Sequence, residues 1–115
     1  MTLDFACKKF NLEEVIRCSF NLSKGEFSIL KTLLSNKKYF STQELEDLTA
    51  LDRSTVQRGV KKRYESQLLE RSQINLNGGG YQFSYKIKSK NEIRQKIILV
   101  IQNWSKRVQE EFDNW

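Results

Sequence analysis

The sequence predicts a mainly α-helical chain with one β-hairpin, an α+β fold. Three observations support this expectation. Capping signals precede stretches in which apolar residues recur every three or four positions, as in helices that bury one face. A glycine turn near position 79 is followed by a run that alternates apolar and polar residues, as in a hairpin strand. Residues 91–115 have a single long apolar stripe at helical spacing.

Composition limits the class of protein. At 115 residues, with 38% hydrophobic and 30% charged residues, the chain suits one soluble globular domain. No apolar run approaches the roughly 20 residues of a membrane span, and the N-terminus lacks a signal-peptide pattern, so we expect no membrane partner and a cytoplasmic location. The sequence has no histidine, the commonest general base and metal ligand. We therefore expect no enzyme activity, no metal and no cofactor.

The net charge of +6 is concentrated in one third of the chain. Positions 53–90 hold nine basic and two acidic residues, a balance of +7, whereas the remainder holds 11 basic and 12 acidic residues. Charge that only keeps a protein soluble would be spread more evenly. The concentration of positive charge therefore indicates a surface that binds a polyanion.

Residues 1–22 form the expected N-terminal helical region. Asn11 can cap a short helix, and Glu13 and Glu14 in its first turn suit the positive end of the helix dipole. Cys7 and Cys18 match no disulfide framework or zinc site. We expect both to be buried or half-buried, and the alternative is a pair of accessible redox-sensing thiols.

Two capping boxes start the next two expected helices. In each, a serine and the glutamate three residues later satisfy each other's backbone N–H groups, over Ser23–Glu26 and Ser41–Glu44. The first helix should end near Asn36, a residue that tolerates the left-handed conformation common after helix ends. The second helix is shorter and should turn Leu45 and Leu48 inward.

The basic segment opens with a helix expected from about Arg53 to Ser66, which Asp52 can cap, with Ser54 and Gln57 as a competing start one turn later. On a helical wheel one side holds Val56, Val60, Tyr64 and Leu68. The opposite side holds Thr55, Arg58 and Lys62, flanked by Ser54 and Lys61. Arginine can bind a guanine edge through two hydrogen bonds and lysine can contact phosphates, so this side suits a DNA groove. A solvated surface helix is the alternative.

A hairpin is expected after this helix. Residues 77–80, Asn-Gly-Gly-Gly, form its turn, because glycine accepts positive φ at little steric cost. The strand that follows has an aromatic side made of Tyr81, Phe83, Tyr85 and Ile87. We expect this side to pack on the core, and the alternative is that its rings stack on single-stranded bases. The other side is polar and basic.

The terminal helix has apolar residues three or four positions apart, at Ile93, Ile97, Ile101, Trp104, Val108, Phe112 and Trp115. Such a stripe is more than a small domain can bury once its hairpin has an apolar side of its own. We therefore expect the residues from Ile93 to Phe112 to form a homodimer interface, with packing inside the subunit as the alternative.

These elements describe a winged helix-turn-helix domain that ends in a long helix. Over about residues 20–90 the chain resembles the winged helix-turn-helix transcriptional regulators of the TrmB and MarR-like type. The resemblance rests on SKGEFSILKTLL, STQELEDLTALDRSTVQRGVKK and LLERSQINLNGGGYQFSYKI. We expect one domain over 1–115, with an N-terminal region 1–22, a core 23–90, a wing at about 69–88 and a dimerisation helix 91–115.

The resemblance implies a homodimeric regulator that binds double-stranded DNA sequence-specifically. The helix in the major groove would contact base edges through Arg53, Ser54, Thr55, Gln57 and Arg58. Phosphates would be contacted by Ser41, Thr42, Lys61, Lys62, Lys86 and Lys88. No pattern identifies a small-molecule effector. The alternatives are a winged helix that binds DNA or RNA without reading bases, and a protein-interaction module that uses the terminal helix.

Several positions depart from the pattern of these regulators. Arg63 stands at the core boundary where leucine is usual, so it must extend outward or pair, for example near Glu65 or with a phosphate. Gln67 stands where glycine usually ends the helix. Gly59 costs about 1 kcal/mol against alanine inside a helix, which indicates close approach of another helix or of DNA. The wing has no arginine at its tip, so strong minor-groove reading is not expected.

Overall fold

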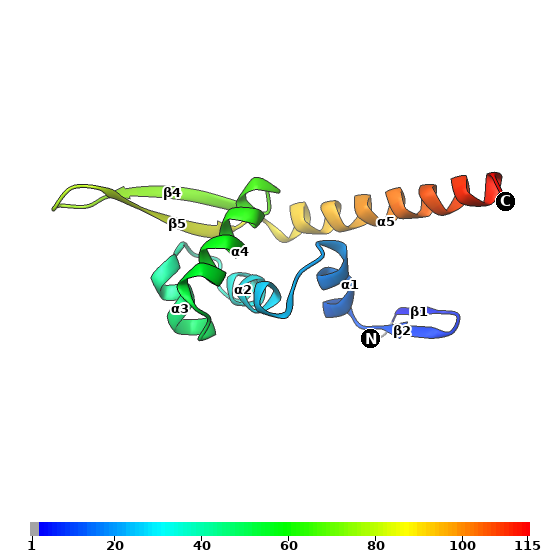
Figure 1. Ribbon diagram of the computed structural model, residues 1–115, viewed down its shortest axis with the longest axis horizontal. Coiled ribbons are helices and arrows are strands. Elements are labelled where there is room, and N and C mark those ends of the chain that lie inside the picture. The colour runs from blue at the N-terminus through cyan, green and yellow to red at the C-terminus, as the bar shows by residue number, and fades with distance from the viewer. Residues whose placement is uncertain (1–2) are drawn as a thin grey trace. The chain divides into compact units, whose positions relative to one another are not determined.

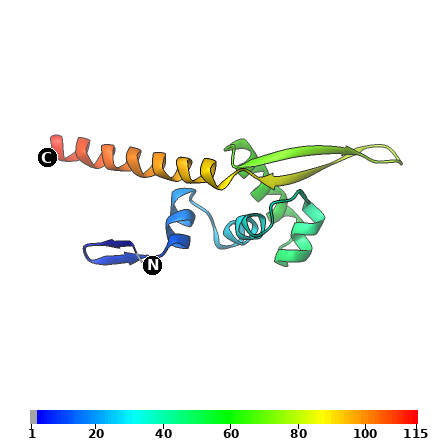
Figure 2. The same cartoon turned by 180° about the vertical axis from the view of Figure 1, so that it is seen from behind.

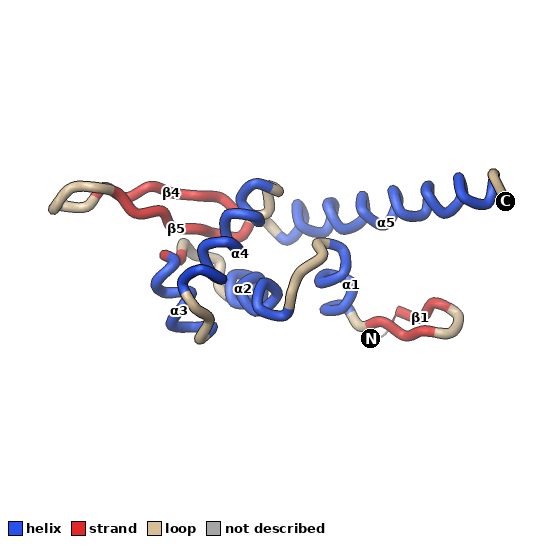
Figure 3. Tube along the Cα trace, in the orientation of Figure 1, coloured by secondary structure: helices blue, strands red, loops and turns tan. Residues whose placement is uncertain are grey.

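A computed structural model describes residues 3–115 of the chain in two compact units. One unit joins the segment up to Leu22 to Ser89–Trp115, and the other is Ser23–Lys88. Helices dominate both units, with small antiparallel sheets and a long C-terminal helix (Figures 1 and 3). The expected fold class, a winged helix-turn-helix of mainly α-helical content, is confirmed.

The unit Ser23–Lys88 consists of three helices and a three-stranded antiparallel sheet. Its elements are α2 (Lys24–Ser35), β3 (Phe40–Ser41), α3 (Thr42–Thr49), α4 (Arg53–Glu65), β4 (Leu69–Asn75) and β5 (Tyr81–Ile87). The strand order is β3-β5-β4, so β5 is the central strand. The register pairs Leu69 with Ile87 at the base of the wing and Asn75 with Tyr81 near its tip.

The core of this unit lies where the three helices meet the base of the sheet. Its most fully buried side chains are Ile29, Leu30, Leu33, Phe40, Leu45, Val56, Val60, Leu68 and Leu69. Burying each one contributes about 1.5–3 kcal/mol relative to leaving it in water. This packing holds α4 against α2 and α3, so that the opposite side of α4 faces solvent.

Both expected capping boxes are present, and α2 ends beside Asn36 as expected. Two finer expectations are wrong, the left-handed conformation of Asn36 and the inward side chain of Leu48. Asn36 follows α2 in an extended conformation with φ −138°, because the chain turns there toward β3, and the left-handed cap falls instead on Ala50 after α3. Leu48 is 60% exposed rather than inward. Helix α3 has little more than two turns, and its buried side is limited to Leu45.

Helix α4 ends at Gln67 in the left-handed conformation, with φ +65°. The N–H of Leu68 donates to the carbonyl of Arg63 at 2.9 Å, and the N–H of Gln67 donates to the carbonyl of Tyr64 at 3.0 Å. This pair of bonds is the Schellman motif. Gln67 therefore takes the role that glycine usually has, at a cost of about 1–2 kcal/mol for a residue with a Cβ.

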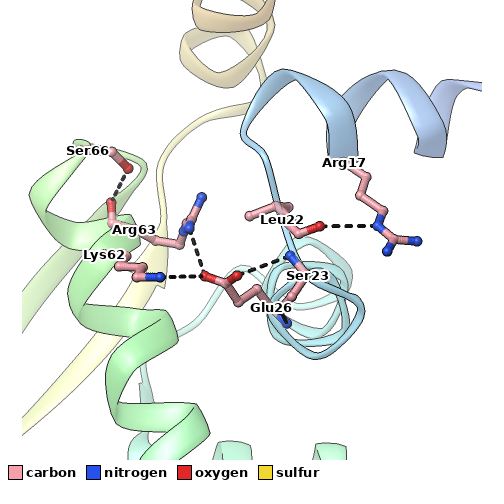
Figure 4. A network of polar contacts seen from close by, with 7 residues as sticks. All are labelled: Arg17, Leu22, Ser23, Glu26, Lys62, Arg63 and Ser66. Carbon is pink, nitrogen blue, oxygen red and sulfur yellow. Dashed lines mark hydrogen bonds and ion pairs between the residues drawn. The ribbon is translucent and has the colours of Figure 1, made fainter.

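An ion pair joins α2 to α4 at the edge of the core (Figure 4). The guanidinium Nη2 of Arg63 lies 2.9 Å from Oε2 of Glu26, and Nζ of Lys62 lies 3.9 Å from the same oxygen. The other oxygen of Glu26 accepts the backbone N–H of Ser23 at 3.1 Å. Arg63 is thus buried and paired across to α2 rather than near Glu65.

Glu26 is held in its charged form by these contacts. Burial by itself would raise the pKa of this carboxyl group. The hydrogen bonds with Ser23 and the charges of Arg63 and Lys62 outweigh burial, so the pKa lies below its usual value of 4.5.

The other unit contains elements near both ends of the chain. They are β1 (Leu3–Phe5), β2 (Lys8–Phe10), α1 (Leu12–Ser19) and α5 (Lys90–Asp113). Asn11 caps α1 by accepting the N–H of Glu14 at 2.8 Å, as expected. The hairpin β1–β2 was not expected from the sequence. No helix within residues 3–115 is both long and apolar enough to cross a membrane.

The expectation that both cysteines are buried or half-buried is wrong. Cys7 lies in the tight turn that joins β1 to β2, and Cys18 lies on the exposed side of α1. A two-residue turn and a helix of two turns offer little surface under which a thiol could be covered.

We predict that Glu26→Gln lowers the free energy of unfolding by about 2 kcal/mol at pH 7, because a buried guanidinium loses its charged partner. Urea denaturation at fixed pH measures this change. Since the folded-state pKa is lowered, the carboxylate stabilises the fold above pH 4.5, and this contribution is lost as the pH falls through the folded-state pKa. The difference between wild type and variant should therefore shrink in acid.

Glu44→Gln is the matched control. Glu44 accepts the backbone N–H of Ser41 at 3.2 Å in the capping box of α3, but it is exposed. Its replacement should lower stability by less than half as much. Equal losses in the two variants would mean that capping, and not the pair with Arg63, is the contribution of Glu26.

Candidate nucleic-acid interface

The exposed side of α4 is polar and mostly basic. Its exposed residues are Arg53, Ser54, Gln57, Arg58, Lys61, Lys62 and Glu65. Asp52 caps the helix by accepting the N–H of Thr55 at 3.0 Å. Hydrogen bonds from the side chain and backbone of Thr55, with the nearby charge of Arg58, hold the pKa of Asp52 below its usual value. The charged cap fixes the helix start, where groups that reach a DNA groove would lie.

A groove of about 490 Å³ lies between α4 and the hairpin of β4 and β5, and we call it the wing groove. Helix α4 lines it with Arg53, Gln57 and Lys61, and the first residue of α3, Thr42, also lines it. The hairpin contributes Arg71, Tyr81 and Phe83. Four of the predicted contact residues therefore meet in one groove.

Three other predicted residues lie on the opposite flank of α4. Thr55, Arg58 and Lys62 line a smaller recess of about 160 Å³ between α4 and the start of α2. Thr55 is half-buried there, and Arg58 lies along the helix with its Nε donating to the carbonyl of Ser54 at 3.3 Å. The helical wheel had placed these three at the centre of the outward side. Because α2 covers this flank of α4, the centre of the exposed side of the helix lies nearer to Ser54 and Lys61.

Gly59 faces α2. A Cβ atom at this position would lie 2.8 Å from Cδ1 of Ile29, a side chain that is only 1% exposed. The sequence left open whether another helix or DNA approaches Gly59 closely. In the structure a neighbouring helix does so. Glycine thus sets the distance between α2 and α4.

The hairpin presents two different sides. Because side chains alternate along a strand, Arg71, Phe83 and Tyr85 share the side that faces α4. Lys86 lies on the other side, opposite Glu70 in the register, with its Nζ 5.7 Å from the ring of Tyr39. Lys88, just after β5, is half-buried. Lys86 therefore does not line the wing groove.

The aromatic side of β5 packs on the core only at the base of the wing. Tyr85 and Ile87 are buried, but Tyr81 is 58% exposed, and Ile74 and Leu76 near the tip are also exposed. The expectation that this side packs on the core therefore holds at the base of the wing and fails toward its tip, because the hairpin extends past α3 and α4 (Figures 1 and 2).

The remaining predicted contact residues are already engaged or partly covered. Ser41 accepts the N–H of Glu44 through its Oγ at 3.1 Å, so its side chain serves the cap of α3. Thr42 is half-buried. Sequence reasoning counted Arg71 in the basic segment but did not identify it as a contact residue. Pairing β4 with the aromatic strand would have placed it on the side that faces α4.

The residues predicted for the dimer interface differ in exposure along α5. Ile93 is buried, Ile97 and Val108 are half-buried, and the exposed members are Ile101, Trp104 and Phe112. Ile98, Leu99 and Val100 add exposed apolar surface to the same helix. Helix α5 therefore presents more apolar surface than the predicted stripe alone.

One family profile, two sequence relatives and several solved structures match this chain. The family profile of the DnaD N-terminal domain matches residues 10–108. Two proteins of Methanocaldococcus jannaschii are similar in sequence. One is 24% identical over 104 residues, covering 90% of this chain and 78% of its own length, and the other is 26% identical over 101 residues, covering 88% and 82%.

Among solved structures, a "possible transcriptional regulator" from Methanosarcina mazei is 45% identical with a TM-score of 0.92, covering all of this chain and 97% of its own. A Sulfolobus tokodaii protein is 21% identical, TM-score 0.70, covering 84% and 93%. Staphylococcus aureus MarR, in complex with salicylate and kanamycin, is 17% identical, TM-score 0.52, covering 87% and 65%. The last two show a shared fold.

We predict that Gly59→Ala lowers the free energy of unfolding by about 1 kcal/mol. The added methyl group would push against Ile29, and overpacking of this kind costs about 1–3 kcal/mol, against about 1 kcal/mol gained in helix propensity. Thermal or urea denaturation measures the difference.

Gly25→Ala is the control, because a Cβ at position 25 would meet its neighbours Leu51 and Thr55 only at 3.5–3.7 Å, which is ordinary contact. This variant should be as stable as wild type or more stable. If Gly59→Ala were stabilised as much as Gly25→Ala, the crossing of α2 and α4 would not depend on glycine.

Proposed function

We propose that this chain, which belongs to the DnaD N-terminal domain family, is a transcriptional regulator that binds double-stranded DNA sequence-specifically as a homodimer. One observation carries the proposal. The exposed side of α4 is basic and has the wing at its flank, so a positively charged helix and hairpin are available to a DNA duplex together. The Methanosarcina mazei protein of nearly identical fold, described as a possible transcriptional regulator, supports the same proposal.

In this proposal α4 lies in the major groove with its first two turns toward base edges. Arg53, Ser54, Gln57 and Arg58 are exposed there, and arginine and glutamine side chains can each form paired hydrogen bonds with a base. Thr55 is the most shielded member of the proposed set, because α2 covers part of it.

Phosphates would be bound around this helix. Thr42 and Lys61 line the wing groove, and Ser41 lies at the start of α3. The Nζ of Lys62, which lies 3.9 Å from Glu26, would move partly away from this carboxylate to contact a phosphate. Lys86 and Lys88 would contact a phosphate only on the other side of the wing from the groove.

Dimerisation through α5 would complete the regulator. Ile97, Ile101, Trp104, Val108 and Phe112 remain half-buried or exposed in one chain, and apolar surface of this extent usually meets a partner. Ile93 is already buried and would add little. Two α4 helices related by a twofold axis would read half-sites ~34–36 Å apart in a pseudo-palindrome. We also propose that the chain acts in the cytoplasm without a cofactor and is related to TrmB-type regulators.

We predict that Arg58→Ala reduces the preference for a specific duplex over a random duplex by about 10-fold or more, because a paired contact with a base is lost. Lys61→Ala should weaken both duplexes alike and lower the slope of log affinity against log salt by about one, because it removes one phosphate contact. Fluorescence anisotropy over a salt series measures both quantities, with an operator selected from random sequences.

The wild-type protein provides the test of the proposed function. A preference of about 10³-fold or more for the selected duplex is expected of a sequence-specific regulator. Equal affinity for selected and random duplexes, or for RNA, would replace the proposal by binding without base reading. Absence of binding to any nucleic acid at low salt would leave α5 as the main interaction surface.

We predict that Trp104→Ala raises the dissociation constant of the homodimer by about 30-fold, the loss expected for an aromatic side chain at the centre of an interface. Sedimentation velocity over a dilution series measures it. Asn103→Ala, a change at the neighbouring exposed polar residue, should leave the dimer unchanged. Wild-type protein that stays monomeric at high concentration would contradict the dimer.

A further inference from the structure

Arg71, in the first half of β4, has an unusual environment. Its guanidinium carbon lies 4.2 Å from the centre of the Tyr64 ring on α4 and 4.0 Å from the centre of the Phe83 ring on β5. Both rings are themselves held, Tyr64 against Tyr85 at 6.4 Å and Phe83 against Tyr81 at 5.0 Å. Two aromatic rings, one on α4 and one on β5, therefore contact the same arginine head group and restrict its orientation.

The hydrogen-bonding capacity of this guanidinium is unused. Within residues 3–115, the guanidinium of Arg71 makes no hydrogen bond or ion pair with another side chain or with the backbone, and its contacts are with the two rings. Ring contacts leave the N–H groups in the guanidinium plane available, and the residue as a whole is exposed at the wing groove. A planar fork of donors in a restricted orientation suits two oxygens of one anion.

The charge of the groove indicates an anionic partner. Arg53 and Lys61 line the wall formed by α4, facing the hairpin that contributes Arg71, and Glu65 is the acidic residue among the lining side chains. Three cations against one carboxylate attract a polyanion. The groove is also bordered by the part of α4 that we propose reads DNA.

We infer that Arg71 is a phosphate-binding residue that grips the backbone of duplex DNA in the wing groove, with Tyr64 and Phe83 as its positioning residues. The inference rests on the proposed function. Because the rings restrict the guanidinium before DNA arrives, less side-chain freedom is lost on binding than for an unrestrained arginine or lysine. The contact fixes the wing against one DNA strand while α4 occupies the adjacent groove.

The inference also distinguishes the two sides of the wing. Lys86 has the same charge and lies on the neighbouring strand, but on the side away from α4 and opposite Glu70. If the DNA backbone enters the wing groove, the affinity for the duplex should depend on Arg71. If the duplex binds over the other side of the wing, its affinity should depend on Lys86.

The test uses the full chain and a mixed-sequence DNA duplex over a salt series, with Arg71→Gln, Arg71→Lys and the matched Lys86→Gln. Arg71→Gln should lower affinity about 10-fold and reduce the salt slope by about one. Arg71→Lys should keep the slope and still lose affinity several-fold, because lysine lacks the fork. Lys86→Gln should change affinity less than Arg71→Gln. Phe83→Leu, checked for an unchanged melting temperature, should weaken binding without changing the slope.

Wild-type affinity in Arg71→Gln, or a larger loss in Lys86→Gln, would overturn the assignment while leaving duplex binding intact. Wild-type affinity in Arg71→Lys would show that the paired donors of the guanidinium, and the rings of Tyr64 and Phe83 that position it, are not needed for binding. A wild-type protein that binds no duplex would overturn the proposed function and the inference together. If a free mononucleotide displaced the duplex from wild type but not from Arg71→Lys, the site would be a nucleotide site and the inference would be wrong.

Discussion

The contact between α2 and α4 is the constraint on which the DNA-facing side of the molecule depends. Gly59 allows the two helices to approach, and the carboxylate of Glu26 joins them by pairing with Arg63. The same carboxylate caps α2 through Ser23. The Glu26 side chain thus caps the start of α2 and also pairs with Arg63 of α4. This pair helps to fix the rotation of α4 about its own axis. Which residues of α4 face outward is therefore decided at its inner side.

Much of the fold could be predicted because its signals are local. The capping boxes at Ser23 and Ser41, the cap at Asp52 and the glycine turn each depend on residues within a few positions, and all are present. The cap at Gln67 was expected from the resemblance alone, because glycine usually ends this helix in those regulators. The long terminal helix followed from its regular apolar spacing.

What could not be predicted depends on packing between distant segments. The sequence left the partner of Arg63 open because Glu26 is 37 residues away. A helical wheel considers α4 without its neighbours, so it could not show that α2 shields Thr55. The role of Arg71 required the register of β4 on β5, and the hairpin β1–β2 has strands of only three residues, too short to show an alternating pattern.

The Schellman motif at Gln67 has a consequence for how a duplex would be recognised. Only residues 66–68 separate α4 from β4. The N–H of Leu68, just before β4, donates to the carbonyl of Arg63, and the N–H of Lys88, just after β5, donates to the carbonyl of Leu68, so the helix end is bonded to the residues that flank both wing strands. These bonds hold the end of α4 and the base of the wing at a fixed separation. A fixed separation favours duplexes whose groove width already matches it, and other duplexes must deform to bind. The mechanical properties of a DNA sequence would therefore influence binding even at positions that no side chain touches.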